Sequence, residues 1–339
     1  MRDGDRRSRL ALAAAALLAL AFLLGACGSS DELPPPAEPA VSPPVSVAPD
    51  GRVVDVGHMP EGVVADPATG LVAVGLRDPD RLALVDGRSG EVVRRTPLPE
   101  APRHLQLAAP GGPVLVPAEG ADALLEVSLP DGRIAARTPG GEFPHDAAAV
   151  GDRRFVADEF GDAVSVVEDG RAIATLDAPV QPGGVAALGR ETVGVVAVRG
   201  NVLRVYDART LRPLGDAGAG AGPTHIVADP VAERFFIADT RGEALLFSIA
   251  GERPEIFDRL NLPGPPYGLA IDPRRRRIWV TLPASNELAE VELEGNEPTV
   301  VRTYPTVRQP NSVAVDPKTG TLFVAGRAGG ELEIIRPDP

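Results

Sequence analysis

The chain has 339 residues, few of them aromatic (4%), and it is rich in glycine (37) and proline (36). It is long enough to bury a sizeable core, and its many turn-forming residues favour short strands over long helices. The formal net charge of −13 argues against a nucleic-acid partner and against adsorption on anionic lipid, because both attract basic surfaces.

The first 26 residues have the pattern of an export signal. Arginines precede an apolar run over 10–24, which is shorter than the roughly 18–20 residues of a spanning helix. The run ends in Leu24-Gly25-Ala26-Cys27, which resembles the bacterial lipobox. The resemblance implies a lipoprotein signal peptide over 1–26 and lipidation, with palmitate, at Cys27. It also implies an extracytoplasmic protein anchored to a bacterial membrane, at the cell surface or in the periplasm.

Residues 27–50 combine many prolines with Ser, Ala and acidic residues. Such a composition buries little surface and favours extended polyproline conformations. It predicts a disordered but semi-rigid tether between the anchor and the domain that follows. Cys27 is the only cysteine, so the protein has no internal disulfide.

The remainder of the chain, 51–339, repeats itself seven times. Each copy begins with a proline followed within three residues by a short apolar strand, and the prolines lie 38 to 44 residues apart. A period near 40–45 residues with four strands in each copy is typical of β-propeller blades. The seven prolines are Pro60, Pro102, Pro144, Pro182, Pro223, Pro266 and Pro310.

Four strands are predicted in each copy, for example over 226–229, 234–238, 245–249 and 255–260 in the fifth. Asp-Pro turns such as Asp66-Pro67 and Asp229-Pro230 link the first two strands, because these residues preset and cap a turn. The four arginines at 274–277 fall in such a turn, where we expect them to be solvated.

The two ends of the chain predict how the ring closes. The last copy supplies strands over 313–316, 321–324 and 332–335 and then stops, without a fourth strand. Residues 52–56 lie ahead of the first proline, where a fourth strand ends in every other copy. We therefore predict one all-β domain over 51–339, a propeller of seven four-stranded antiparallel blades. The N-terminal strand 52–56 completes the last blade and removes its open edge.

The copies resemble the YVTN-type propeller repeats of bacterial exported proteins. Residues 155–167 carry the best version of that family's middle-strand signature, and 323–326 and 237–240 carry weaker ones. The resemblance implies a fold, and this fold hosts many functions.

Unusual polar residues gather in the loops on one face of the predicted ring. The loop entering each first strand and the loop after each second strand open on the same face. His58, His104, His145 and His225 lie at the first kind of loop. The second kind carries Arg77, Glu119, Glu159, Arg199 and Arg327.

Three interpretations of these residues stay open. They can be structural, as histidines bonded to neighbouring blades and a ring of ion pairs. They can bind a small polar or anionic ligand, or a peptide, through Arg77, His104, Glu159, Arg199, His225 and Arg327. A metal site is the third, but the histidines lie on different blades and no short ligand spacing supports it, so no metal and no cofactor are predicted.

An enzymatic alternative rests on a second resemblance. Pro102-Arg103-His104 with Glu119, and Pro144-His145, are similar to elements of seven-bladed lactonases, although their order is reversed here. The resemblance implies a hydrolase acting on a small lactone or sugar acid, with Arg103, Glu119 and His145 as catalytic candidates. Arginine would hold a carboxylate and the acid or imidazole would activate water.

The preferred hypothesis is a non-catalytic binding or interaction module that uses one face of its central channel. Its partner would be a small ligand, a peptide or a protein, and the closed ring is expected to be a monomer. The hypothesis requires an open mouth: it would lose its physical basis if Arg103, His104, Glu119 and Glu159 were buried in mutual pairs beneath a capped mouth.

Overall fold

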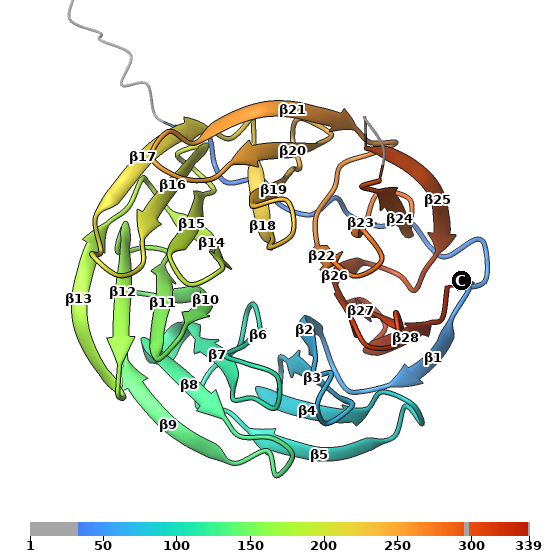
Figure 1. The fold of residues 1–339 in the computed structure, drawn as a ribbon. Helices are drawn as coiled ribbons and strands as arrows, with labels where there is room; N and C mark the ends of the chain where they lie inside the picture. The colour runs from blue at the N-terminus through green and yellow to red at the C-terminus, as the bar shows by residue number, and fades with distance from the viewer. Residues whose placement is uncertain (1–32, 295–297, 338–339) are drawn as a thin grey trace, which may run out of the picture. The chain divides into compact units, whose positions relative to one another are not determined.

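The computed structural model describes residues 33–294 and 298–337 (Figure 1). Contacts divide the chain into two units, Met1–Pro35 and Pro36–Pro339. The predicted signal peptide and Cys27 lie outside the described residues. Within the described ranges, no helix is long and apolar enough to cross a membrane.

The second unit is a ring of seven antiparallel sheets, each with four strands, which confirms the predicted β-propeller (Figure 1). In each blade the first strand lies innermost and the fourth outermost. The strands of blades 1 to 3 are β2 (Pro60–Ala65), β3 (Leu71–Leu76), β4 (Arg81–Asp86), β5 (Val92–Pro97); β6 (Gln106–Leu107), β7 (Val114–Ala118), β8 (Ala123–Val127), β9 (Ile134–Pro139); and β10 (Pro144–Val150), β11 (Arg153–Asp158), β12 (Ala163–Glu168), β13 (Arg171–Asp177). A short 3-10 helix, Glu119–Ala121, follows β7.

Blades 4 to 7 continue the same pattern around the ring. Their strands are β14 (Pro182–Leu188), β15 (Thr192–Ala197), β16 (Val202–Asp207), β17 (Pro213–Gly218); β18 (Pro223–Asp229), β19 (Arg234–Asp239), β20 (Ala244–Ile249), β21 (Glu255–Asn261); β22 (Leu269–Asp272), β23 (Arg277–Leu282), β24 (Glu287–Glu292), β25 (Thr299–Pro305); and β26 (Pro310–Val315), β27 (Leu322–Gly326), β28 (Glu331–Ile335) with β1 (Arg52–Asp55).

Ring closure follows the prediction. Strand β1 pairs antiparallel with β28, with Arg52 opposite Ile334 and Asp55 opposite Glu331. The strand ends at Asp55, one residue earlier than expected, and Val56 continues from it into the core with no exposed surface. The first and last repeats are therefore held together by backbone hydrogen bonds as well as by side-chain packing.

Apolar side chains fill the seams between neighbouring blades. Each of the seven seams has its own cluster of buried residues, because a propeller sheet is covered on both faces by its neighbours. The seam between blades 2 and 3 has the smallest cluster, made of Leu115, Leu124, Ala147 and Val156. An ion pair between Arg154 and Glu126 (3.2 Å) also crosses this seam.

Part of the predicted tether packs against the ring. The Ser42 hydroxyl donates to the Pro283 carbonyl (2.6 Å) and accepts from the Gln309 amide (3.1 Å). Asn286 donates to the carbonyl of Pro43 (3.0 Å), and Gln309 donates to that of Ala40 (2.9 Å). We call residues 36–50 the docked segment: unlike the free tether expected from composition, it binds the loops of blades 6 and 7.

The turns between first and second strands contain the expected Asp-Pro pairs, but two of the four arginines at 274–277 behave differently from the prediction. Arg277 is half-buried at the start of β23, where it pairs with Glu290 and Glu292. Asp66 and Asp316 accept backbone N–H groups within their own turns. Arg276, expected in a solvated turn, instead reaches across to blade 5, where its guanidinium contacts both oxygens of the fully buried Asp229 (2.8 and 3.0 Å). This ion pair joins two blades.

Candidate functional site

The residues that follow each opening proline form two layers across the centre of the ring. The residue directly after the proline contributes to the first layer, and the next residue contributes to the second. The first, which we call the charged layer, contains Glu61, Arg103, His145 and Tyr267 together with Arg77, Glu119, Glu159 and Arg327. The second, which we call the cavity floor, contains His104, Asp146, His225 and Ser312 with Gln106 from further along its strand.

The charged layer consists of paired acids and arginines. Arg77 Nη2 lies 2.5 Å from Glu119 Oε2, and Arg327 Nε lies 2.5 Å from Glu61 Oε2. Both glutamates are buried, with 3% and 4% of their surface exposed. Burial opposes ionisation of Glu61, but Arg103, Arg327 and Arg77 outweigh it and hold the pKa of that carboxyl below its usual range.

Arg103 lies among the acids of this layer. Its Nε is 3.9 Å from Glu119 Oε1. Burial disfavours the guanidinium charge, but Tyr267, Glu61, Glu119 and Glu159 together raise the pKa of Arg103. The same burial raises the pKa of Tyr267 to about 12. The positive charge of Arg103 therefore balances the negative charges of Glu61, Glu119 and Glu159.

His145 and Glu159 form a buried dyad beside Arg103. Nδ1 of His145 is 2.6 Å from Glu159 Oε2, and Gln181 donates to Glu159 Oε1 (2.7 Å). Burial alone would raise the pKa of Glu159, but the His145 hydrogen bond and charge, with Gln181 and Arg103, lower it to about 2. Burial lowers the pKa of His145. Since the Glu159 carboxylate can only accept, Nδ1 of His145 carries the hydrogen of this bond and donates it to Oε2.

Glu119, His145 and Glu159 also come close enough together to be considered as metal ligands. Their ligand atoms all lie within 4.8 Å of one another, and carboxylates with imidazole suit several divalent ions. Arg77 and Arg103 already neutralise these carboxylates, so a cation would sit beside two guanidinium groups. The charge balance favours a structural ion-pair layer at this position.

Three of the four histidines meet at the centre, and His58 does not. The rings of His104 and His225 stack with centroids 4.5 Å apart, and the His145 ring meets His104 edge-on at 4.8 Å. Tyr267 packs edge-on against His225 (4.6 Å). His58 is exposed on the loop before β2. Side chains from blades 2, 3, 5 and 6 therefore close the channel at this level.

Asp146 organises the cavity floor. Its Oδ1 accepts from Gln106 Nε2 (3.0 Å) and the Ala147 amide (2.8 Å), and its Oδ2 accepts from the Val185 amide (2.9 Å). His104 Nδ1 lies 3.8 Å from the same carboxylate. Gln106 Nε2 also donates to the Val185 carbonyl (2.7 Å). This network ties blades 2, 3 and 4 together and engages both oxygens of the Asp146 carboxylate.

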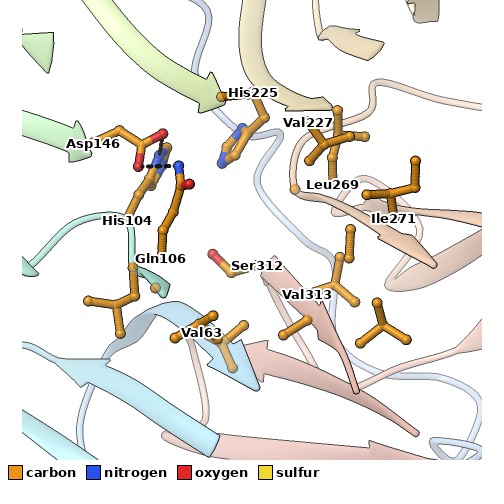
Figure 2. Close-up of a pocket in the computed structure, with 18 of the residues that line it drawn as sticks. Val63, His104, Gln106, Asp146, His225, Val227, Leu269, Ile271, Ser312 and Val313 are labelled. Carbon is orange, nitrogen blue, oxygen red and sulfur yellow. Dashed lines mark hydrogen bonds and ion pairs between the residues drawn. The ribbon is translucent and has the colours of Figure 1, made fainter. Parts of the chain in front are cut away.

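A cavity of about 350 Å³ fills the channel beyond this floor. Figure 2 shows His104, Gln106, Asp146, His225 and Ser312 at its polar end. Its walls are apolar and come from the inner strands toward the turns that follow them, among them Val63, Val227, Leu269, Ile271 and Val313. The volume is at the lower end of the range of about 300–1,000 Å³ typical of small-molecule sites.

The predicted site residues therefore separate into two sets. His104 and His225 line the cavity, whereas Arg77, Arg103, Glu119, His145, Glu159 and Arg327 belong to the charged layer and are absent from the cavity lining over 33–294 and 298–337. Arg199 is half-buried on the loop after β15. Gln106, Asp146 and Ser312 were not among the sequence candidates, although the last two occupy the same repeat position as His104 and His225.

Fold and cavity together define a seven-bladed β-propeller with a ligand-sized chamber in its channel. No protein-family model matches the sequence, and no curated protein matches it. Solved structures share the fold. A chain of the mitotic checkpoint complex has a TM-score of 0.74 and 16% identity over 92% of this chain and 98% of that chain.

Two further structures are similar over most of their length. The β-propeller domain of Cps50 (Swd1) from Myceliophteria thermophila has a TM-score of 0.71 and 12% identity, covering 85% of this chain and 98% of that chain. A streptogramin B lyase has a TM-score of 0.70 and 14% identity, covering 85% and 96%. Such low identities establish the fold and no particular activity, and the resemblance to YVTN-type repeats stays a prediction.

Proposed function

We propose that the protein is an extracytoplasmic β-propeller lipoprotein of the YVTN-like kind, lipidated at Cys27, that binds a small ligand in its channel cavity. The observation that carries the binding role is the chamber itself: about 350 Å³, with apolar walls and a polar floor of five side chains. A pocket of that form is the usual location of a small-molecule site.

The ligand position differs from the one expected from the sequence. Glu119 and Glu159 are buried and paired with Arg77 and His145, and Arg103 is half-buried beside Glu119, which weakens the case for binding through these residues. The charged layer supports a structural role, because each buried acid has a cationic or hydrogen-bonded partner. The binding role thus rests on His104, His225 and the residues around them.

A cavity-filling substitution tests the proposal. We expect Ile271→Trp to fill much of the chamber and to abolish ligand retention, because Ile271 lies in its wall (Figure 2). Ile173→Trp, on the exposed face of β13, is the matched control. The proteins are purified from the same exporting host and extracted with solvent, and the extracts are compared by mass spectrometry. A compound enriched with the wild type and with Ile173→Trp, but lost with Ile271→Trp, supports the proposal, and three identical extracts contradict it.

The anchor is tested separately. Labelled palmitate should be incorporated into the wild type and not into Cys27→Ser, which should be released from the membrane fraction. Equal labelling of the two proteins would refute lipidation at Cys27. A peptide or protein partner, the other occupant expected from the sequence, would be retained equally by wild type and Ile271→Trp.

A lactone hydrolase is the second candidate function. The observation in its favour is that Arg103, Glu119 and His145 come together in one cluster, where Glu119 Oε1 has no hydrogen-bond partner among the described residues. Reaction there needs substrate to enter the charged layer. Purified protein should then open members of a panel of sugar and aliphatic lactones, and Glu119→Gln should abolish turnover. Absence of turnover, or turnover unchanged by Glu119→Gln, would exclude this role.

A further inference from the structure

The cavity floor contains an imidazole for which the fold provides no hydrogen-bond partner. His225 lies at the polar end of the chamber and points into it (Figure 2). Its Nδ1 is buried and has no hydrogen-bond partner among residues 33–294 and 298–337. Stacking on His104 and the edge of Tyr267 fixes the ring in place. Because Nδ1 has no accessible surface, a ligand in the chamber can bond this imidazole only through Nε2.

The chamber offers no countercharge for an anion. Among the described residues that line it there is no lysine or arginine. Burial, with the nearby charges of His104, His145 and Arg103, keeps the pKa of His225 well below its usual range, so its imidazole is neutral. The arginines of the charged layer are already occupied by Glu61 and Glu119.

A cation finds one carboxylate at most. Among the described residues that line the chamber, Asp146 is the only ionisable acid, and both of its oxygens already accept hydrogen bonds from Gln106, Ala147 and Val185. A charged head group at this floor would lose part of its hydration without gaining an opposite charge, whereas a hydroxyl or amide replaces the hydrogen bonds that it loses.

The walls offer contacts to an apolar body. Val63, Val227, Leu269, Ile271 and Val313 each present an apolar side chain to the chamber, beside polar atoms that make up a comparable share of its surface. An apolar cavity of about 150 Å³ accommodates benzene, and this chamber, at about 350 Å³, has roughly twice that volume. It has room for a ring with a short chain that extends from the polar floor.

We propose that the ligand is a small amphipathic molecule with an uncharged hydrogen-bonding head, held by His225 and Ser312, and an apolar body held by the channel walls. This inference rests on the proposed binding function and narrows it, because the sequence allowed polar and anionic ligands alike. Neutral imidazole and hydroxyl groups each donate and accept, so a hydroxyl, amide or ester head satisfies them.

Three probes of matched shape test the charge preference: phenylbutanol, phenylbutanoate and phenylbutylamine. Each is titrated by calorimetry, and by ligand-observed NMR for weak binding, into wild type, Ile271→Trp and the control Ile173→Trp. We expect the alcohol to bind at least about tenfold more tightly than either charged probe. Its binding should be abolished by Ile271→Trp and retained by Ile173→Trp.

The floor residues are tested with His225→Phe, which keeps the ring stacking and removes both nitrogens, and with Ser312→Ala. Each should weaken the alcohol severalfold. If a charged probe binds as tightly as the alcohol and Ile271→Trp abolishes it, the head-group assignment is overturned while the cavity site stands. If His225→Phe and Ser312→Ala bind the alcohol as wild type does, the floor assignment falls. If no probe binds, or if the probes bind Ile271→Trp as tightly as the wild type, both this inference and the proposed cavity site are overturned.

Discussion

Removing the strand that closes the ring should cost the propeller far more stability than removing the docked segment before it. The comparison uses three chains, beginning at residues 36, 49 and 57. The chain that begins at residue 57 lacks β1 and Val56, and burial of one valine is worth about 1.5–3 kcal/mol. It also lacks the Gly51 amide that donates to the buried Glu333 (2.8 Å), a further contribution of about 1.5–3 kcal/mol.

The chain that begins at residue 49 loses mainly the hydrogen bonds around Ser42, each worth about 1 kcal/mol net. It also no longer has to order the backbone of residues 36–48, an entropic cost that opposes folding. These two effects oppose one another, so we expect a smaller loss of stability than for the chain that begins at residue 57.

Thermal unfolding followed by circular dichroism, with urea unfolding as a second measure, separates the cases. A loss of about 3–6 kcal/mol corresponds to a fall of roughly 6–24 °C in Tm for a domain of this size. The exposed edge of β28 should also make the shortest chain prone to association. If the chains that begin at 49 and 57 melt at the same temperature, β1 does not close the ring in the way described.

Two further predictions concern buried charges. Arg276→Ala should destabilise the ring by about 3–5 kcal/mol, because it leaves the buried Asp229 without its partner, whereas Arg274→Ala in the same turn should have little effect; equal urea midpoints would contradict the pairing. Burial raises the pKa of Glu333 to about 7, with Asp50 and Glu331 adding to the rise. Because the folded state holds this proton above the ordinary pKa, the contribution of Glu333 to stability is greatest below about pH 4.5 and falls as the pH rises to about 7. Glu333→Gln should flatten that part of the stability profile, and a profile that keeps its slope would assign it to other groups.

The repeat made the ring predictable from the sequence. Period and turn residues are local signals, and each occurs several times, so an error in one copy is corrected by the others. The fifth copy illustrates this, because strands expected over 234–238 and 245–249 are observed as β19 and β20 with one residue added to each. The closure was predictable because residues 52–56 share the pattern of the outer strands, and β1 pairs with β28 as expected.

The site was less predictable because it depends on departures from the repeat. Arg103 and His104 are adjacent in sequence, and their side chains enter different layers, one paired with Glu119 and the other facing the cavity. Pairing between Arg77 and Glu119 joins two blades, and no spacing within one copy reveals it. The docked segment follows the same reasoning, since Ser42 finds its partners at Pro283 and Gln309. The composition of residues 36–50 predicts an extended backbone, but it does not predict that this segment binds the loops of blades 6 and 7.

Unequal residues at one repeat position explain why the chamber has a floor at all. Glycine occupies that position in blades 1, 4 and 6, and a Cβ at Gly62 or Gly268 would collide with the carbonyl oxygen of Arg103 or Asn311 in the next blade. The close approach of these backbones lets His104 and His225 reach one another across the channel and stack. Seven identical side chains at this repeat position could not close the channel in this way. Large side chains would collide at the axis, and small ones would leave it open. The repeat therefore accounts for the ring, and the residues that break the repeat close one end of its channel and form the binding chamber.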